Sequence, residues 1–477
     1  MNSFGANEFI NIFRQLITVF IIDTPTNRPG AYMLKFDLKK LLPWMIPVLF
    51  QLFFLLTALN SHHQYTRDSQ EYLNQAYNIF HHQTFYCGEP GQPVTDVSLY
   101  SRRPPGYGLF ILITSLFLHI PNLTLVIQSV LSVFNLYLGY RIARLLVPSF
   151  QSPWIFALLS CALPSQFIIA ATFMSEIPFQ TALLLSGYYL LLYEKPDGQY
   201  RHLYVHHFFI FCAYMIKPIA GLLWVISALY IIATQNESRS VIRLAVLSFL
   251  HLLVMAAGLA RNYHYTGIAE GSSIPHKVVV NYNLRILLSE VYGESRSSML
   301  MDSLQEEMQK ETYALQSAIA DQFIRQQISD HPAAYLKVHT RGMLKFFIDP
   351  GRWEIVLWEQ GMENADNPPS LITTYRTTGW EGVVRIAGLP QLILTFYAAV
   401  MAIVLSVMLL IWLVLRKTNK HHKLFIAGLL FYFSFMTGPS ASARFKIPVY
   451  PLMITAACLL LTHKPSAEPM PENRGKM

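Results

Sequence analysis

Two acidic side chains and two arginines mark residues 60–105 as a place where this chain could do chemistry. Asp68 and Glu71 stand three positions apart, so on a helix they share one face. A carboxylate placed there can act as a general base that takes a proton from an acceptor hydroxyl. Arg102 and Arg103 close the segment, and guanidinium groups match phosphate oxygens. We therefore expect a base beside phosphate-binding cations, with the solvated face of a surface helix as the alternative.

A third acidic side chain opens a later apolar run. Ser175, Glu176 and Pro178 are residue types favoured at the start of a helix, so helix capping alone would explain them. Glu176 is nevertheless expected at the same edge of the membrane as Asp68. Two carboxylates there could orient a sugar or bind a divalent metal such as Mg2+ or Mn2+ through their oxygens. Asp68 and Glu176 are therefore the candidate metal ligands, and no other cofactor is indicated.

Several further cations are expected on the outer side of the membrane, against the tendency of Lys and Arg to remain in the cytoplasm. They can bind phosphate through charge-assisted hydrogen bonds, or extend toward lipid headgroups from an interfacial position. In addition to the arginine pair, they are Lys217, Arg261, Arg444 and Lys446.

The overall composition is that of a membrane protein. Of 477 residues, 53% are hydrophobic and only 13% are charged, whereas soluble domains carry about 25% charged residues. The formal net charge of +8 is attributed to Lys and Arg on the cytoplasmic side, so no nucleic-acid partner is expected. The 4 cysteines are too few for a disulfide framework. The sequence has no phosphate-binding loop, dinucleotide-binding glycine motif or C-x-x-C pair, which leaves nucleotide hydrolysis, nicotinamide chemistry and a zinc finger unsupported.

The apolar segments predict an all-α polytopic membrane protein with about ten transmembrane helices, with about 11 to 13 as the alternative count. The first expected span, Leu41–Leu59, follows a group of lysines, so the chain should enter the membrane from the cytoplasm. Residues 106–120 are short for a span, and we expect them to be re-entrant or interfacial. Under that assumption the cations of the connecting loops fall on the cytoplasmic side, together with both termini.

The expected organisation begins with residues 1–34. They lack the features of a cleavable signal peptide. We expect them to form a cytoplasmic or interfacial segment, or to precede a true start at Met33. A membrane module with the catalytic first outer loop follows, then an outer domain, the last spans and a cytoplasmic tail. These parts are residues 35–260 with loop 60–105, residues 261–385, residues 386–463 and residues 464–477.

Short motifs at the membrane edges form a recognisable series. They are Arg67-Asp68-Ser69-Gln70-Glu71-Tyr72 with Ala76, Arg103-Pro104-Pro105-Gly106-Tyr107, Ser175-Glu176-Ile177-Pro178, Arg261-Asn262-Tyr263 with Gly267, and Ala443-Arg444-Phe445-Lys446-Ile447-Pro448-Val449-Tyr450-Pro451. In order and outward placement, along most of residues 35–465, this series resembles the membrane glycosyltransferases of the GT-C fold. The resemblance is greatest to the bacterial relatives of protein O-mannosyltransferases and lipid A aminoarabinose transferases.

The resemblance implies an enzyme that transfers a sugar from a polyprenyl-phosphate donor to a lipid, glycan or protein hydroxyl. The reaction would invert the anomeric carbon and take place at the outer face of a bacterial cytoplasmic membrane. Asp68 takes the place of the catalytic acid in the first loop, with Glu71 beside it, while Glu176 stands where the family often has Asp. That departure leaves a metal requirement open. The resemblance also assigns groups of residues to substrates: Arg444, Arg102, Arg103, Lys217 and Arg261 to the donor phosphate, Tyr72, Tyr107 and Asn262 to the sugar or acceptor, and residues 261–385 to acceptor specificity.

Two other functions stay open from the sequence. A membrane polysaccharide polymerase or ligase would use glycans on a lipid diphosphate and depend more on arginines than on Asp68. A transporter or flippase would place polar groups near the middle of the bilayer, often on broken helices within internal repeats. The acids here stand at the ends of expected spans, and no repeat is visible.

Overall fold

The structure is a computed structural model that describes residues 38–196, 198–234, 238–365, 369–415 and 419–462. These residues form helices and loops, and no strand occurs among them. Contacts divide the chain into Met1–Pro43 and Trp44–Met477. Residues 38–43 are the described part of the first unit and include the short helix α2 (Leu38–Leu41). The expected segments 1–34 and 464–477 lie outside the described residues. The membrane bundle and the candidate site belong to the second unit.

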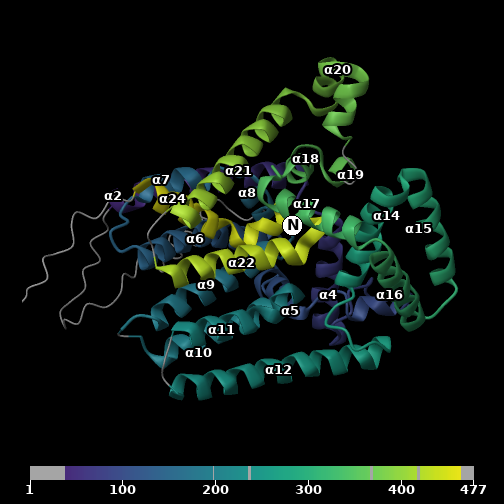
Figure 1. The fold of residues 1–477 in the computed structure, drawn as a ribbon, viewed down its shortest axis with the longest axis horizontal. Helices are drawn as coiled ribbons and strands as arrows, with labels where there is room; N and C mark the ends of the chain where they lie inside the picture. Colours follow the sequence, from purple (N-terminus) through teal and green to yellow (C-terminus); the bar gives the residue numbers. More distant parts are fainter. Residues whose placement is uncertain (1–37, 197, 235–237, 366–368, 416–418, 463–477) are drawn as a thin grey trace, which may run out of the picture. The chain divides into compact units, whose positions relative to one another are not determined.

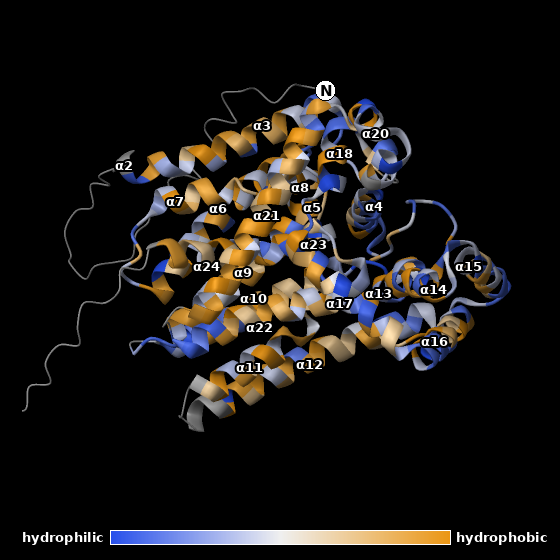
Figure 2. Cartoon of the chain, turned by 45° about the horizontal axis from the view of Figure 1, so that its top comes forward, coloured by the Kyte–Doolittle hydropathy of each residue, from blue (hydrophilic) through white to orange (hydrophobic). Residues whose placement is uncertain are grey.

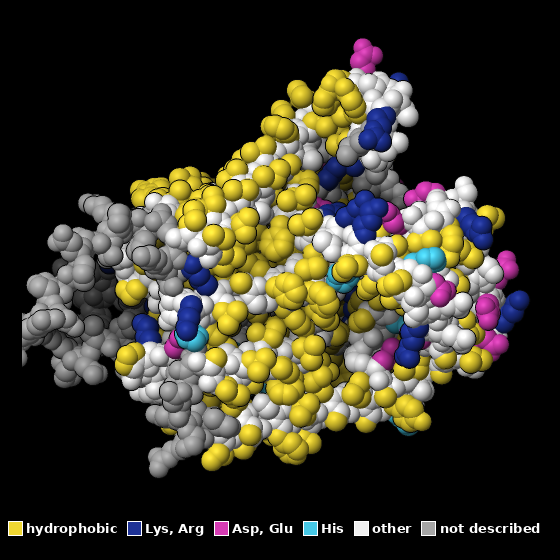
Figure 3. Space-filling view, viewed as in Figure 1, with side chains coloured by type: hydrophobic (Ala, Val, Ile, Leu, Met, Phe, Trp, Pro, Cys, Tyr) yellow, Lys and Arg dark blue, Asp and Glu magenta, His cyan; other side chains and the backbone are white. Residues whose placement is uncertain are grey.

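Five helices of the described chain are long and apolar enough to cross a membrane. They are Leu42–Ser61, Leu123–Leu146, Ile242–Thr266, Leu389–Leu415 and Ala443–Leu461. Two shorter apolar helices are Pro105–Leu116 and Pro218–Ala233. Apolar residues line the long helices in Figure 2, and in Figure 3 hydrophobic side chains cover the middle of one face while charged ones gather toward its ends. Together these features indicate a helical membrane protein.

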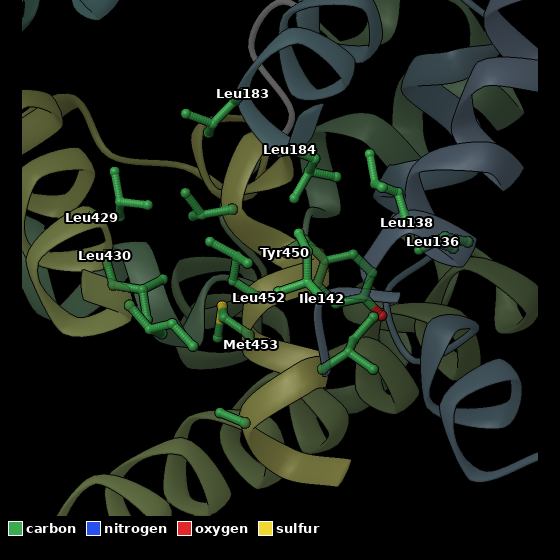
Figure 4. Close-up of a cluster of buried hydrophobic side chains, with 14 of the residues drawn as sticks. Leu136, Leu138, Ile142, Leu183, Leu184, Leu429, Leu430, Tyr450, Leu452 and Met453 are labelled. Atoms are coloured by element: carbon green, nitrogen blue, oxygen red, sulfur yellow. The ribbon is translucent and has the colours of Figure 1, made fainter. Parts of the chain in front are cut away.

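The centre of the bundle is α9 (Glu176–Tyr193), which packs between α6 (Leu123–Leu146) and α10 (Tyr200–Ile216) (Figure 1). The last helix, α24 (Tyr450–Thr462), packs against α6 and α21 (Leu389–Leu415). Leucines of α6, α9, α22 (Lys420–Thr437) and α24, with Ile142, Tyr450 and Met453, form the buried cluster of Figure 4. Because lipid is as apolar as these side chains, close packing and hydrogen bonds are what hold such helices together.

Buried amides supply those hydrogen bonds. Gln180 on α9 donates to Gln166 Oε1 at 3.0 Å and also bonds to the backbone oxygen of Ile447. Asn135 on α6 donates to Gln180 Oε1 at 2.8 Å. Gln51, on α3 (Met45–Ser61), donates to Phe167 O in α8 (Ser165–Ala170) at 3.2 Å. A polar group inside an apolar bundle is costly unless it is paired, so these amides fix which helices are neighbours.

The first loop, residues 60–105, is anchored by α4 (Arg67–His82). Thr66 begins the helix with a capping box, in which its hydroxyl accepts from Ser69 N at 3.2 Å and Ser69 Oγ accepts from Thr66 N at 2.8 Å. The buried face of α4 packs on α5 (Pro105–Ile111). There the ring of Tyr72 contacts the ring of Tyr107 edge to face, with the ring centroids 4.7 Å apart. The predicted helix carrying Asp68 and Glu71 on one face is therefore present.

The remaining elements connect or cover this core. After α5 come η3 (Leu112–Leu116), α7 (Pro153–Ser160), η4 (Pro218–Leu222), α11 (Leu223–Thr234), α12 (Ser238–Thr266), α22 (Lys420–Thr437), η6 (Gly438–Ser440), α23 (Ala443–Lys446) and η7 (Ile447–Val449). Residues 153–170 are apolar enough to be expected as one of the ten spans, but they form the two short helices α7 and α8, with a break over residues 161–164 that ends at Pro164. Proline lacks the amide hydrogen that a continuous helix needs.

The long segment after α12 is a chain of helices. They are α13 (Ile274–Val278), η5 (Val279–Leu284), α14 (Arg285–Tyr292), α15 (Glu294–Gln309), α16 (Tyr313–Asp330), α17 (Pro332–Ile348), α18 (Arg352–Gln360), α19 (Met362–Ala365) and α20 (Leu371–Ala387). Residues 299–328, whose sequence has helical periodicity and mixed charge, fall largely within α15 and α16. Helices α14–α16 share a small apolar core, whereas α17 and α18 pack back onto the membrane bundle.

Gly342 lets α17 approach the backbone of η6. A Cβ added at this position would stand 2.0 Å from Gly438 O, which is fixed main chain. We expect Gly342→Ala to lower the free energy of unfolding by about 1–3 kcal/mol, because the helix must move away. Gly428→Ala on α22 is the matched control, since a Cβ there meets nothing within 4 Å. It should be neutral or stabilising by up to about 1 kcal/mol. Denaturant unfolding in detergent measures both, and equal stabilities of the two variants would contradict the close approach.

Candidate functional site

The acids and arginines of the first loop form one set of ion pairs. Arg103 Nε donates to Glu71 Oε2 at 2.6 Å, and Arg103 Nη2 donates to Asp68 Oδ1 at 2.7 Å. The same guanidinium lies over the ring of Tyr72, 4.7 Å from its centroid, and donates to its hydroxyl at 3.2 Å. Gln75 on α4 donates to the backbone oxygen of Arg103 at 2.8 Å, which holds the arginine against the helix.

Arg102 extends this set of ion pairs toward residues 261–385. Its Nη1 donates to Glu71 Oε1 at 2.9 Å, and its Nε donates to Ser273 Oγ, next to the start of α13, at 3.2 Å. Asp96 lies at the rim, 3.2 Å from Arg102 Nη2 and 3.6 Å from Lys277 Nζ. The sequence motifs include neither Asp96 nor Ser273, because their contact with Arg102 depends on how the loop folds back.

Arg444 joins the first loop to two distant parts of the chain. Its Nη2 donates to Asp68 Oδ2 at 2.7 Å, and its Nε donates to Glu176 Oε1 at 2.6 Å. Lys217 Nζ donates to the same Glu176 oxygen at 2.8 Å. We call Asp68, Glu71, Glu176, Arg102, Arg103, Lys217 and Arg444 the ion network. Segments far apart in the sequence therefore meet at one place.

Local sequence explains how these side chains are aimed. Lys217 precedes Pro218, which disfavours helical backbone, and it is extended at φ −140° and ψ 128° where α10 ends. The turn before Glu176 is held by Ser69 Oγ, which donates to Phe173 O at 3.0 Å, and by Gln128, which donates to Thr172 O at 2.8 Å. Ser175 makes no side-chain capping bond, and its hydroxyl lies 2.9 Å from that of Tyr72. Helix capping by Ser175 therefore does not account for this motif.

The charges of the ion network nearly cancel. Its four cations face three carboxylates, which leaves one net positive charge. Burial alone would raise the pKa of Asp68, but Arg103 and Arg444 together hold that pKa below its usual range. Asp68 is thus ionised at neutral pH and is a weak base while both guanidinium groups bind it. An anion that draws one guanidinium away would raise the pKa of Asp68 and make it a stronger base.

Three of the expected substrate-binding residues have local partners instead. Arg261 Nη1 donates to the backbone oxygen of Tyr100 and, at 2.7 Å, to Asn262 Oδ1. Asn262 in turn donates to Glu270 O at 2.7 Å, so both residues fasten α12 to neighbouring loops. Tyr107 is fully buried, and its hydroxyl donates to Gln128 on α6. Tyr72, by contrast, contacts the ion network directly through Arg103.

The proposed metal ligands already face cations. Both oxygens of Asp68 accept from arginines, and Glu176 Oε1 accepts from Arg444 and Lys217, which leaves Glu176 Oε2 as the one oxygen of the two carboxylates without a partner. Within the described part of the chain, no group of three or more His, Cys, Asp or Glu side chains is arranged to hold a metal ion. The donor set at this site therefore does not fit a divalent metal, and we derive no step through one.

Comparisons with known proteins do not assign this chain to a family. No protein-family model matches it, and no curated protein matches it. The likeness to GT-C enzymes therefore rests on the motifs, and what the site could do is argued from its geometry.

Glu176 is the most deeply buried anion of the ion network, with a side chain 0% exposed. We expect Glu176→Gln to lower the free energy of unfolding by about 3–5 kcal/mol, because Arg444 and Lys217 lose a shared buried anion. Asp96→Asn is the comparison, since that side chain is 43% exposed and also pairs with Arg102. Its cost should stay below about 1 kcal/mol. Denaturant unfolding at neutral pH compares the two, and equal losses would contradict the central role of Glu176.

Proposed function

We propose that this protein transfers a sugar from a polyprenyl-phosphate donor to a hydroxyl of a lipid, glycan or protein. The reaction takes place at the outer face of a bacterial cytoplasmic membrane. The observation that carries the proposal is Arg444, which bonds both Asp68 and Glu176 inside a network with one surplus positive charge. A candidate base and a candidate phosphate-binding cation are thereby in direct contact, at the end of an apolar helix that could cross the membrane.

The arrangement suits displacement at the anomeric carbon. The acceptor oxygen forms a bond to that carbon as the bond from the carbon to the phosphate oxygen breaks, and the carbon is inverted. The acceptor proton passes to Asp68, while the bonding electrons leave with the phosphate, which gains negative charge. We call Arg102, Arg103, Lys217 and Arg444 the phosphate cradle. Cations fixed where charge develops stabilise the transition state more than the ground state.

Donor binding also prepares the base in this mechanism. In the structure Asp68 accepts from Arg103 and Arg444, which weakens it as a base. A donor phosphate competes for the same guanidinium groups. As it takes over one of them, the pKa of Asp68 rises toward the range in which it can accept a proton. Asp68 would therefore act as a base mainly when the donor is bound.

One observation favours a transporter instead. His206 and His207 on α10 and His251 on α12 are buried, and ring nitrogens of all three lack a hydrogen-bond partner. Ionisable side chains within apolar helices often mark transport pathways. His207 stands about three helical turns before Lys217 on α10, away from the end of the helix that carries the ion network. Substrate uptake into vesicles without chemical conversion would support transport over sugar transfer.

The proposal places about ten spans in the membrane with residues 106–120 not crossing it. The loop between α9 and α10 should then be cytoplasmic and the first loop external. We expect an impermeant maleimide to label Gln92→Cys on intact cells and to leave Gln199→Cys unlabelled until the membrane is opened. Both positions are exposed in the structure. The chain without added cysteines gives the background, and labelling of the second variant on intact cells would invert this topology.

Asp68→Asn tests the base directly. We expect sugar transfer to fall by about 100- to 10,000-fold, because the amide cannot take the acceptor proton. Mass spectrometry of membrane lipids should show a sugar-loaded polyprenyl monophosphate in cells that lack the protein or carry Asp68→Asn, but not with wild type. Glu89→Gln removes one charge from the same loop at an exposed side chain and should behave as wild type.

The amount of folded protein is compared in parallel for both variants. Near-normal transfer by a well-folded Asp68→Asn variant would rule out Asp68 as the base. A lipid-diphosphate oligosaccharide that accumulates in place of the monophosphate would favour a polymerase or ligase.

A further inference from the structure

Glu354 is a buried carboxyl group that the proposed mechanism does not use. It lies on α18, is 1% exposed, and neither of its carboxyl oxygens has a hydrogen-bond partner. An isolated carboxylate in such a place is costly, so the group must either bind something or carry a proton. It is absent from the motifs of the sequence, because its surroundings come from segments far away in the chain.

Gly351 shows how closely this carboxyl approaches the ion network. The glycine has φ +79°, and a Cβ added to it would meet Ser165 Oγ at 1.9 Å, Glu354 Oε2 at 3.1 Å and Ala443 Cβ at 3.2 Å. The hydroxyl of Ser165 also lacks a partner. Ala443 directly precedes Arg444, so Glu354 lies behind the residue that binds Asp68 and Glu176.

The charged groups around Glu354 can be named element by element. Asp349, in the turn before α18, repels a negative charge there, while Arg444 and Lys446 on α23 attract one. Helices α3, α8 and α21, which pack against α18, carry no charged residue, and Glu363 on α19 is exposed. Helix α18 itself also carries Glu359 and Arg352, whose Nη1 donates to Pro369 O. Burial outweighs the two cations and, with Asp349, raises the pKa of Glu354 to about 7. The carboxyl can therefore change its charge at physiological pH.

The charge of Glu354 decides the net charge around Arg444. The ion network alone has one surplus positive charge, and Lys446 and Asp349 add one charge of each sign beside it. With Glu354 protonated the surplus remains, and it equals the single negative charge of a phosphodiester. With Glu354 ionised the surplus is cancelled.

We propose that Glu354 is a positioning residue that sets the charge of the phosphate cradle, so that the cradle accepts a phosphate anion when this carboxyl holds a proton. The inference rests on the proposed function only in taking Arg444 to bind phosphate. Binding of the anion draws a proton onto Glu354, and loss of that proton weakens the binding.

The test measures binding of decyl methyl phosphate, a diester that keeps one negative charge between pH 5 and pH 9, to the full-length protein in detergent. Wild type should bind about tenfold more weakly at pH 8 than at pH 6, because the competent fraction falls as Glu354 ionises. Glu354→Gln keeps a neutral side chain of the same shape, so it should lose the change centred near pH 7. It should keep only the smaller change at the alkaline end that comes from Lys446, because burial lowers the pKa of Lys446 to about 8. Glu363→Gln removes an exposed charge nearby and should keep the pH dependence of wild type.

A wild-type affinity that does not change with pH, or a Glu354→Gln variant that keeps the change centred near pH 7, would overturn the inference and leave the proposed function standing. If no protein binds the diester at any pH, the phosphate cradle itself is wrong, and both proposals fall.

Thermal unfolding gives a second readout that needs no ligand. The pKa of Glu354 is raised from the ordinary value of 4.5 to about 7 in the folded chain. Its contribution to stability is therefore full below pH 4.5 and is lost as pH rises through 7. The melting temperature of wild type should fall more between pH 5 and pH 8 than that of Glu354→Gln. Parallel pH profiles of the two proteins would show that Glu354 does not hold the proton, which also overturns the inference.

Discussion

The paired hydrogen bonds of Arg444 are the interaction on which the site depends. One side of the guanidinium binds Asp68 from the first loop, and the other binds Glu176 at the start of α9. Removing charges from water is costly, and attraction offsets that cost only when every group has a good partner. The network meets this condition largely by sharing: Glu176 Oε1 serves two cations and Arg103 serves two carboxylates, whereas Glu176 Oε2 is buried without a partner. Its parts are therefore mutually dependent, and a change at one member alters the charge that the others experience.

The sequence predicted which residues form this network, because their charges and their expected positions at the ends of spans pointed to the same place. Asp68, Glu71 and Glu176, with Arg102, Arg103, Lys217 and Arg444, were all expected at one membrane edge, and they are in contact. Arg261 and Asn262 show the limit of such reasoning. A motif indicates the side of the membrane on which a residue lies, whereas its partners depend on depth and on how loops fold back. Glu354 could not have been found in this way, because it is buried by α8 and α23 rather than by its neighbours in sequence.

The number of spans illustrates another limit. Apolar length suggested about ten spans, whereas five of the described helices meet a strict requirement for length and hydropathy. Helices such as α9 do not meet it, although α9 is largely buried, because it carries Gln180, Ser186 and several tyrosines. Side chains of this kind bond to neighbouring helices and need not face lipid. Leu123–Leu146 and Ala443–Leu461 are recognised although they are mostly buried, so it is the polar side chains of a helix, and not its central place in the bundle, that hide it from hydropathy.

The separation of Asp68 from Arg444 along the chain, 376 residues, has a consequence for how the protein is made. A membrane protein is synthesised from its N-terminus, and domains of large proteins form in that order. The first loop emerges early, but the arginine that binds its acid belongs to the last apolar helix. The site is thus completed only after that helix has been made, and a chain whose synthesis stops before it can pair Asp68 with Arg103 and Glu176 with Lys217 but still lacks the guanidinium that joins the two acids.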